Sequence, residues 1–362
     1  MRKIILLLGT IFEDMERIKK QLKELLDLAR SEKKLTVFLI GNTAKKIDSE
    51  FYLTPIRNNS QTIVSGVIVY SEYIAKKISK YIDGKVDYVF VDAEKKIKHK
   101  NSLLGESGNI ERAVKEEVKK SIFISYKGND LTVDAADAFI SEYFSKDIGG
   151  VGGKKVAVVG AGNLGAKLSL KLVERGANVF LFRRSKKILK VIVDSINLIK
   201  PKYTDAEAFQ ADSSVDACRD ADVIIGTSDG VSVIDFDIIN ESSQKLLLID
   251  VGKGSISEQA IMLTQSKNIQ VYRLSIESML EGMIVSLISL HKTVNYKMGR
   301  ANIDGVSVVS GGLLAKKSEI VVDDCNNPKK IYGVGNGIGD FENELDDIVK
   351  DSICLLNRNI SK

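Results

Sequence analysis

The 362-residue chain is too long for one ordinary domain and long enough for two domains that each bury a core. Its 44% hydrophobic and 28% charged residues are typical of a globular protein and exclude a disordered or fibrous chain. The net charge is only +5 and the basic runs are short and scattered, so we expect no nucleic-acid-binding surface.

The cysteines exclude two further classes of protein. Cys218, Cys325 and Cys354 are far apart, lack Cys-x-x-Cys spacing, and accompany only two histidines. This pattern predicts neither a disulfide framework nor a metal site.

The amino-terminal apolar run, residues 4–8, is too short for a signal peptide and is followed at once by acidic residues. We interpret it as the first buried strand of a cytoplasmic protein. The longest apolar stretch, residues 279–290, is interrupted by Glu281 and Gly282, so we expect no membrane span. That stretch is apolar nearly all round, which predicts burial either between domains or at a homodimer interface.

The first third of the chain alternates β-branched runs with helical periodicity, which is typical of a parallel sheet covered by helices. It is expected to form an α/β substrate domain over residues 1–131. After residues 4–8, the expected strands are 35–40, 63–70, 88–91 and 121–126, and residues 41–61 are interpreted as a polar connection. Helices are expected near residues 15–29, 72–82 and 110–119.

Residues 132–150 are expected to connect two domains. Apolar residues recur with helical spacing over 132–144, and four glycines follow within residues 149–153, which marks a hinge. The predicted dinucleotide-binding Rossmann domain covers residues 151–292. A carboxy-terminal extension over 293–362 is expected to contain strands at 306–309 and 320–322 and a closing helix at 341–356 that packs on the first domain.

A glycine-rich motif, Gly160-Ala161-Gly162-Asn163-Leu164-Gly165, directly follows the apolar run 155–159 and begins a helical run. In the dinucleotide-binding version of this turn, Gly160 permits the turn and Gly162 lets the backbone approach the pyrophosphate. Gly165 lets the helix pack closely on the sheet, and the helix amino terminus binds the phosphates. Further strands are expected at 179–182, 206–209, 222–226, 245–251 and 269–272.

The end of the second Rossmann strand predicts the cofactor. An acidic residue there binds the ribose 2′-hydroxyl of NAD, whereas the 2′-phosphate of NADP requires cations. The chain has Arg183-Arg184-Ser185-Lys186-Lys187 and no acid at this point, which favours NADP(H). The alternative is that one arginine is only solvated. The expected cofactor-binding residues are Gly160, Gly162, Asn163, Leu164, Gly165, Arg183, Arg184, Ser185, Lys186, Thr227, Ser228 and Val251.

These motifs resemble the superfamily of shikimate dehydrogenase, glutamyl-tRNA reductase and methylenetetrahydrofolate dehydrogenase. Arg183-Arg184-Ser185-Lys186 is similar to an Asn-Arg-Thr signature of the first two families, and residues 224–230 resemble their loop after the fourth strand. The resemblance covers about residues 120–275 and implies that a catalytic α/β domain precedes the Rossmann domain. The nucleophilic cysteine of glutamyl-tRNA reductase is missing, because no cysteine precedes Cys218, and the shikimate-binding motifs are also missing.

Two clusters are candidates for catalysis. Tyr73 and Lys77 resemble the Tyr-x-x-x-Lys pair of the methylenetetrahydrofolate family, and their spacing places both on one helical face, where the lysine would donate a proton or stabilise charge. The alternative is a solvated lysine-rich face. Asp130 lies where the shikimate family has an Asn-Thr-Asp segment, and would be a general base or orienter with Lys127 or Lys77 as its partner. The alternative is that Asp130 or Thr132 caps the connecting helix.

The residues of the extension predict no clear chemistry. Its acidic pair, Asp323 and Asp324, is interpreted as a turn rather than a metal site, because no histidine supports it. The function expected from the whole sequence is hydride transfer between NADP(H) and a small polar substrate held in an interdomain cleft. A non-catalytic NADP(H) sensor is the alternative, because the family substrate motifs are missing.

Overall fold

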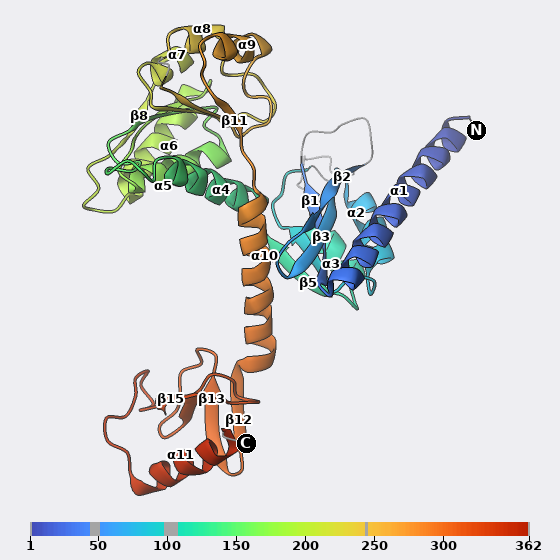
Figure 1. The fold of residues 1–362 in the computed structure, drawn as a ribbon, viewed down its shortest axis with the longest axis vertical. Coiled ribbons are helices and arrows are strands. Elements are labelled where there is room, and N and C mark those ends of the chain that lie inside the picture. The colour runs from blue at the N-terminus through green and yellow to red at the C-terminus, as the bar shows by residue number, and fades with distance from the viewer. Residues whose placement is uncertain (1, 44–50, 98–107, 243–244, 361–362) are drawn as a thin grey trace. The chain divides into compact units, whose positions relative to one another are not determined.

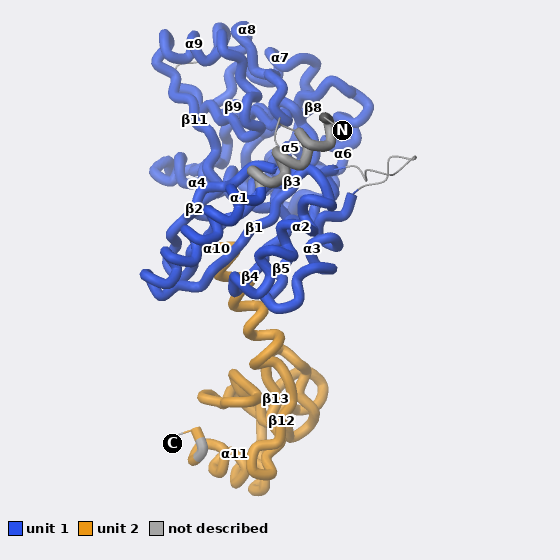
Figure 2. The backbone as a smooth tube through the Cα atoms, turned by 90° about the vertical axis from the view of Figure 1, so that its right-hand side faces the viewer, with its two compact units in different colours: residues 1–281 blue, residues 282–362 orange. Residues whose placement is uncertain are grey.

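The computed structural model describes residues 2–43, 51–97, 108–242 and 245–360. The chain divides into two compact units, residues 1–281 and residues 282–362 (Figure 2). The first unit contains an amino-terminal α/β domain and the Rossmann domain, and the second contains a small sheet and a helix (Figure 1). The predicted fold class is therefore confirmed.

A five-stranded mixed sheet forms the first domain, in the order β2-β3-β1-β4-β5. All neighbours pair in parallel except β2, which lies antiparallel to β3 at the edge. The apolar stripe at Ile18, Leu22 and Leu25 is buried in the same core as the inner strands, as the helical spacing predicted. The elements are α1 (Arg2–Glu32), β1 (Leu35–Asn42), β2 (Phe51–Asn58), β3 (Thr62–Val69), α2 (Glu72–Ile82), β4 (Tyr88–Asp92), α3 (Ile110–Glu117) and β5 (Ile122–Tyr126).

Two expectations for this domain were wrong. Residues 4–8 are not a strand but part of α1, which runs unbroken from Arg2 to Glu32. A short apolar run fits a strand and a helix equally well, and leucine favours helix where no turn follows. The stretch 41–61 contains β2, which includes Pro55. A proline excludes a central strand but is tolerated at an edge, and the register of β2 shifts between Thr54 and Arg57.

The Rossmann sheet has six parallel strands in the order β11-β10-β9-β6-β7-β8, which places the switch of strand order between β6 and β9. Two buried apolar clusters cover its two faces. Its elements are α4 (Gly128–Tyr143), β6 (Lys155–Val159), α5 (Asn163–Glu174), β7 (Asn178–Phe182), α6 (Lys186–Ile199), β8 (Ala208–Gln210), α7 (Ser214–Cys218), β9 (Val223–Gly226), α8 (Phe236–Asn240), β10 (Leu247–Asp250), α9 (Glu258–Ser266) and β11 (Val271–Arg273).

The boundary between the two units falls within α10 (Glu277–Lys292), which continues into the π-helical turn η1 (Thr293–Lys297). A four-stranded sheet follows, in the order β12-β13-β14-β15. Its strands are β12 (Gly299–Ile303), β13 (Val306–Ser310), β14 (Ile320–Val322) and β15 (Ile331–Val334), and α11 (Asp347–Ile360) ends the chain.

The closing helix starts later than expected, at Asp347 rather than near residue 341. Val349 and Leu356 of this helix share a buried cluster with Val308 and Ile320 of the adjacent sheet. The expected packing of the helix on the first domain stays a prediction. The amphipathic pattern predicted the helix but not which surface it covers.

Within the described residues, no helix combines the length and the apolar character needed to span a lipid bilayer.

Candidate functional site

The glycine-rich turn between β6 and α5 has the geometry of a phosphate-binding loop. Gly160 has φ +95°, and a Cβ there would lie 2.9 Å from the backbone nitrogen of Ser228. A Cβ at Gly165 would lie 2.7 Å from Thr227 Oγ1, so α5 packs closely on the sheet. These two positions require glycine for backbone conformation and packing.

Gly162 is different, because a Cβ there would meet nothing nearer than the carbonyl oxygen of Gly160, at 3.7 Å. Gly162 is also the N-cap of α5, and it has no side chain to bond the amide groups of Leu164 and Gly165 in the first turn. Free amide groups and open space at a helix amino terminus fit the pyrophosphate of a dinucleotide.

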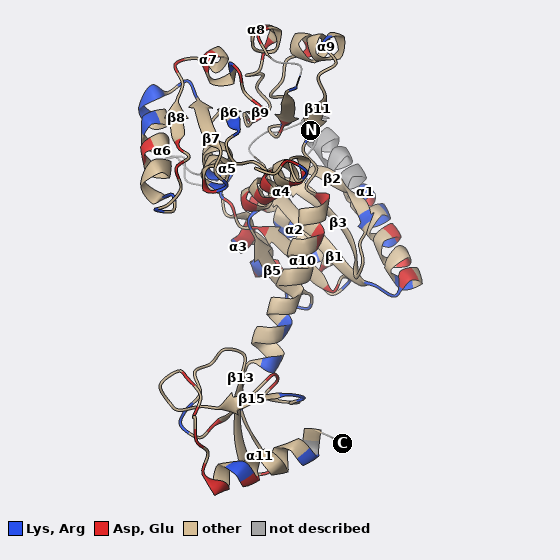
Figure 3. Cartoon of the chain, turned by 60° about the vertical axis from the view of Figure 1, so that its left-hand side comes forward, with Lys and Arg blue, Asp and Glu red and all other residues tan. Residues whose placement is uncertain are grey.

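The predicted 2′-phosphate residues follow β7. Arg183 is half-buried and its Nη1 donates a 3.1 Å hydrogen bond to the carbonyl oxygen of Ala161, which holds its guanidinium beside the glycine turn. Arg184 is exposed, and Ser185 is the N-cap of α6 with no side-chain capping bond. Lys186 pairs with Asp212 at 2.9 Å, and this hydrogen bond lowers the pKa of that carboxyl. The basic beginning of α6 is visible in Figure 3.

The loop after β9 lies against the glycine turn, and the loop after β10 lies against the end of β9 and its loop. Thr227 Oγ1 donates to the carbonyl oxygen of Gly160 at 3.0 Å, and the buried Val251 donates its amide to the carbonyl oxygen of Gly226 at 3.0 Å. The hydroxyl of Ser228 donates to the carbonyl oxygen of Val231. The structure thus brings Thr227 and Ser228 close to the glycine turn, at the switch of strand order.

Sequence reasoning missed a buried acid at the end of β10. Asp250 is 4% exposed and accepts hydrogen bonds from the amides of Gly254 and Ser255 and from Ser255 Oγ, the last at 2.6 Å. Burial would raise the pKa of the Asp250 carboxyl, but these hydrogen bonds outweigh it and hold the pKa below its usual value. The sequence did contain a signal for Asp250, because it is an acidic residue at the carboxyl end of a predicted strand.

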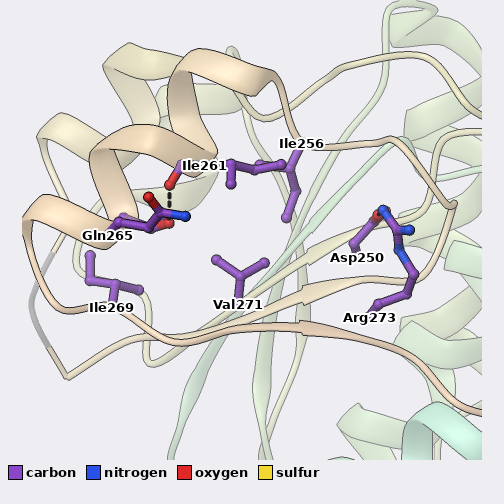
Figure 4. Close-up of a pocket in the computed structure, with 8 residues that line it drawn as sticks. Asp250, Ile256, Ile261, Gln265, Ile269, Val271 and Arg273 are labelled. Atoms are coloured by element: carbon purple, nitrogen blue, oxygen red, sulfur yellow. Dashed lines mark hydrogen bonds and ion pairs between the residues drawn. The ribbon is translucent and has the colours of Figure 1, made fainter.

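Asp250 also borders a cavity of about 430 Å³ between the last two strands and α9 (Figure 4). Arg273 Nη2 lies 3.4 Å from the carboxylate at one end, and Ile256, Ile261 and Val271 make the wall apolar. The glycine turn contributes no residue to its lining, so this cavity is separate from the dinucleotide-binding features.

Asp130, the candidate base, lies on the first turn of α4. Its carboxylate pairs with Lys167 of α5 and lies 3.8 Å from Lys127 Nζ. The hydrogen bond from Lys167 is the main reason that the pKa of Asp130 is lowered. The expected partner Lys127 is therefore near, whereas the ion pairs that the structure describes for Asp130 do not include Lys77.

The same pattern continues along the two helices. Asp134 pairs with Lys171 at 3.1 Å, and Asp137 forms a two-pronged pair with Arg175 at 2.5 and 2.8 Å. We call these contacts and the Asp130 pair the α4–α5 ladder. Because residues one turn apart share a helical face, one side of α4 is matched to one side of α5.

The amino terminus of α4 is not capped by the residues considered from the sequence. The N-cap is Lys127, without a side-chain bond, and Thr132 donates its hydroxyl to the carbonyl oxygen of Gly128 instead. The amides of Gly128 and Asn129 are bonded by Asp92 at 3.1 Å and Glu94 at 3.2 Å. Carboxylates stabilise this end of a helix, because it carries the positive end of the dipole.

Asp92 and Glu94 also bind Lys96, at 2.7 and 2.8 Å from its Nζ. Burial lowers the pKa of Lys96, but the charges and hydrogen bonds of Asp92 and Glu94 together outweigh it, so the pKa is raised. The side-chain Nδ2 of Asn129 donates to Asn163 Oδ1 at 3.5 Å, which brings the beginnings of α4 and α5 together. Sequence reasoning missed this cluster, although Asp92 directly follows the predicted strand 88–91.

Tyr73 and Lys77 share one face of α2, as their spacing predicted. Tyr73 is 63% exposed and Lys77 is half-buried, while the intervening Lys76 pairs with Glu116 of α3 at 2.5 Å. The contacts described for Asp130 include neither Tyr73 nor Lys77. The structure therefore does not join the two candidate clusters.

The acidic pair of the second unit forms a turn. Asp323 accepts the amides of Lys329 and Lys330 at 2.8 and 3.0 Å, and Asp324 accepts the amides of Asn326 and Asn327. Both carboxylates are therefore engaged by backbone groups, as in the turn interpretation.

Comparison with known proteins identifies the central region. A family model described as NADP oxidoreductase, coenzyme F420-dependent, matches residues 155–254. Adenosylhomocysteinase of Thermoplasma volcanium is 25% identical over 224 residues, which cover 57% of this chain and 51% of that protein. The Thermoplasma acidophilum enzyme is 24% identical over 226 residues, with the same coverage. The chain spans about half the length of the curated relatives it matches.

Two solved structures are similar at low identity. The A chain of dipicolinate synthase from Bacillus subtilis has a TM-score of 0.36 and 12% identity over 72% of this chain and 98% of that chain. Glutamate dehydrogenase from Plasmodium falciparum has a TM-score of 0.40 and 12% identity over 72% of this chain and 64% of that chain.

The family-model match begins at β6 and ends in the loop after β10, so it contains the glycine turn and the loop after β9 that contacts it. The chain therefore contains an NAD(P)-binding Rossmann domain like those of dehydrogenases, preceded by a second α/β domain. The narrower superfamily expected from the sequence stays a prediction.

Proposed function

We propose that the protein is an NADP-dependent oxidoreductase that exchanges a hydride with a small polar substrate of the hydroxy/keto or imino/amine type. The observation that carries the proposal is the open, uncapped amino terminus of α5 at Gly162, with the Arg183 guanidinium held beside it. In the reductive direction NADPH supplies a hydride to the carbon of a C=O or C=N group, and a proton from solvent is added to the oxygen or nitrogen.

The cofactor-binding residues form two groups, one for the pyrophosphate and one for the 2′-phosphate. The first-turn amides of α5, from Asn163 to Gly165, bind the pyrophosphate. Arg184, Ser185 and Lys186 bind the 2′-phosphate together with Arg183, because guanidinium groups and a hydroxyl form charge-assisted hydrogen bonds to it. The pair with Lys186 reduces the repulsion that Asp212 would exert on the phosphate.

The choice of NADP over NAD is tested by replacing the two arginines. We expect Arg183→Ala with Arg184→Ala to weaken NADPH binding by on the order of 10- to 100-fold for each charge-assisted hydrogen bond removed, and NADH binding much less. Calorimetric titration of both cofactors measures the difference. Lys190→Ala is the matched control, because it removes a charge from the adjoining helix α6, where the ion pair described for Lys190 is with Asp194. Equal losses for NADPH and NADH would show that the arginines do not recognise the 2′-phosphate.

For catalysis we propose that Asp130 orients Lys127 toward the substrate. The lowered pKa of Asp130 makes its carboxylate a weak base, but the same carboxylate lies 3.8 Å from the Lys127 ammonium, which is exposed and passes a proton from solvent to the substrate. We expect Asp130→Asn to keep NADPH affinity and to lower turnover by on the order of 100-fold. The assay is the absorbance change at 340 nm with a substrate found by screening small keto, hydroxy and imino compounds.

The α4–α5 ladder offers a matched control for this variant. Asp134→Asn breaks the next ion pair along the same helix, and both pairs are about half exposed, so each change should cost less than about 1 kcal/mol of stability. Equal turnover in the two variants would show that Asp130 has only a structural role. Lys77→Met tests by the same turnover measurement whether the face with Tyr73 and Lys77 takes part in catalysis.

A non-catalytic NADP(H) sensor is the second candidate. It is favoured by two observations: Tyr73 is largely exposed, and Asp130 is engaged by Lys167 rather than by Lys77. A sensor would bind NADPH without turning over any compound of the screen.

A further inference from the structure

The loops that follow β9 and β10 form one rigid surface, which we call the β9–β10 platform (residues 227–235 and 251–257). The amide of Gly230 donates to the carbonyl oxygen of Gly252 at 3.1 Å, and the amide of Gly252 donates to that of Gly226 at 3.0 Å. A Cβ at Gly252 would lie 1.7 Å from the carbonyl oxygen of Ser228, so the two backbones are in direct contact. The loops therefore cannot move apart without breaking these bonds.

The buried Asp250, at the end of β10, holds the following loop (residues 251–257) in place. Its carboxylate accepts the amides of Gly254 and Ser255 and the Ser255 hydroxyl, and Arg273 lies beside it (Figure 4). Hydrogen bonds to a buried carboxylate are among the stronger ones in proteins. The backbone on both sides of Lys253 is thus held in place.

Lys253 itself has a left-handed backbone conformation, with φ +54°. This conformation is unfavourable for a residue with a Cβ, and glycine adopts it without strain. The neighbouring Gly254 is also left-handed, at φ +105°. The strain at Lys253 is a reason to look for a role of its side chain, because glycine would form the same turn with less strain.

The Lys253 side chain is exposed, and it is the sole lysine or arginine of the platform. Among the residues that the structure describes, none forms an ion pair with Lys253. Arg183 and Lys186 lie beyond β7, in the half of the sheet that holds the adenosine phosphates. The platform lies at the carboxyl ends of β9 and β10, in the other half, where the nicotinamide binds in this fold.

We propose that Lys253 binds the carboxylate of the substrate beside the nicotinamide, and that the substrate is therefore a 2-oxo acid or the 2-hydroxy acid formed by its reduction. This rests on the proposed function. The reduction adds a hydride from NADPH to the carbon next to the carboxylate and a solvent proton to its oxygen, giving the hydroxy acid and NADP⁺. An ammonium carried by a fixed backbone at the reacting end selects compounds with an anionic group adjacent to that carbon.

The test uses the full-length protein saturated with NADP⁺, which cannot reduce a 2-oxo acid. Oxalate, pyruvate and 2-oxoglutarate are titrated into this complex in a calorimeter. We expect at least one of them to bind the wild type. Lys253→Met should weaken that binding by on the order of tenfold or more, and Lys253→Arg should retain most of it, because the charge remains. Lys190→Met, on α6, is the matched control and should bind like the wild type.

Lys253→Gly keeps the test independent of folding. We expect it to lose carboxylate binding while its melting temperature stays equal to that of the wild type or rises by a few degrees, because glycine relieves the left-handed strain. A functional lysine on a strained turn predicts this combination, and a merely structural one does not.

Three results would overturn the proposal: none of the three acids binds the NADP⁺ complex, Lys253→Met binds them as tightly as the wild type does, or Lys253→Met weakens NADP⁺ binding itself. The last would assign Lys253 to the cofactor. Failure of the wild type to bind NADP⁺ or NADPH would instead contradict the proposed function, so the two failures are distinguishable.

Discussion

Replacing Gly162 with valine should abolish NADPH binding, by more than about 100-fold, and leave the protein folded. A Cβ at this position meets nothing nearer than the Gly160 carbonyl oxygen, at 3.7 Å, so the protein has room for the added carbon. The bound pyrophosphate does not, because it must lie against the Gly162 backbone and the α5 amides. The measurements are NADPH fluorescence titration and thermal unfolding of the same sample.

Two other glycines serve as controls for this variant. Gly282→Val in α10 adds the same side chain where nothing lies within 4 Å of the Cβ, and should bind NADPH normally. Gly165→Val should instead impair folding, because its Cβ would lie 2.7 Å from Thr227 Oγ1 and 3.2 Å from Val158 Cγ1. Undiminished NADPH affinity in folded Gly162→Val would contradict the placement of the cofactor at this turn.

The Rossmann half of the chain could be predicted well because its local signals agree. The β6 run, the glycine turn and the apolar stripe of α5 each indicate the same strand, turn and helix, and the observed strand order is the one expected for this fold. The roles predicted for Gly160 and Gly165 follow from conformation and packing, which the sequence context specifies.

The errors lie where local patterns permit two structures. Residues 4–8 fit a strand by composition, but the helix of residues 15–29 extends through them. The edge strand β2 includes Pro55, which local rules assign to a loop. Which surface α11 covers is a matter of tertiary packing, and its stripe at Val349 and Leu356 contains no information about its partner.

The candidate site shows the same limit. Lys167 and Asp130 are 37 residues apart, and their pairing depends on how α4 packs on α5. Asp92 lies 36 residues before Gly128, whose amide it bonds. Contacts of this kind have no local signal, so a motif search identifies Asp130 as a candidate base without the lysine that lowers its pKa.

The second large effect is expected at Asp250. Asp250→Ala should lower the free energy of unfolding by about 3 kcal/mol, because it leaves the amides of Gly254 and Ser255 and the Ser255 hydroxyl without their acceptor in a buried place. For a domain of this size the melting temperature should fall by roughly 6–12 °C. Asp194→Ala, which breaks an exposed pair on α6, is the control and should change the free energy of unfolding by less than about 0.5 kcal/mol.

The stabilisation by Asp250 should also depend on pH, and its hydrogen bonds determine whether it is lost at low or at high pH. They hold the pKa of Asp250 below its usual value of about 3.9, so the folded state binds the proton less tightly than the unfolded state does. The stabilisation is complete above about pH 4 and is lost as the pH falls through the lower folded pKa. Stability curves of the wild type and Asp250→Ala, measured by urea unfolding, should therefore converge below about pH 4. A constant difference down to about pH 2.5 would show that the Asp250 carboxylate owes its effect to packing rather than to its charge.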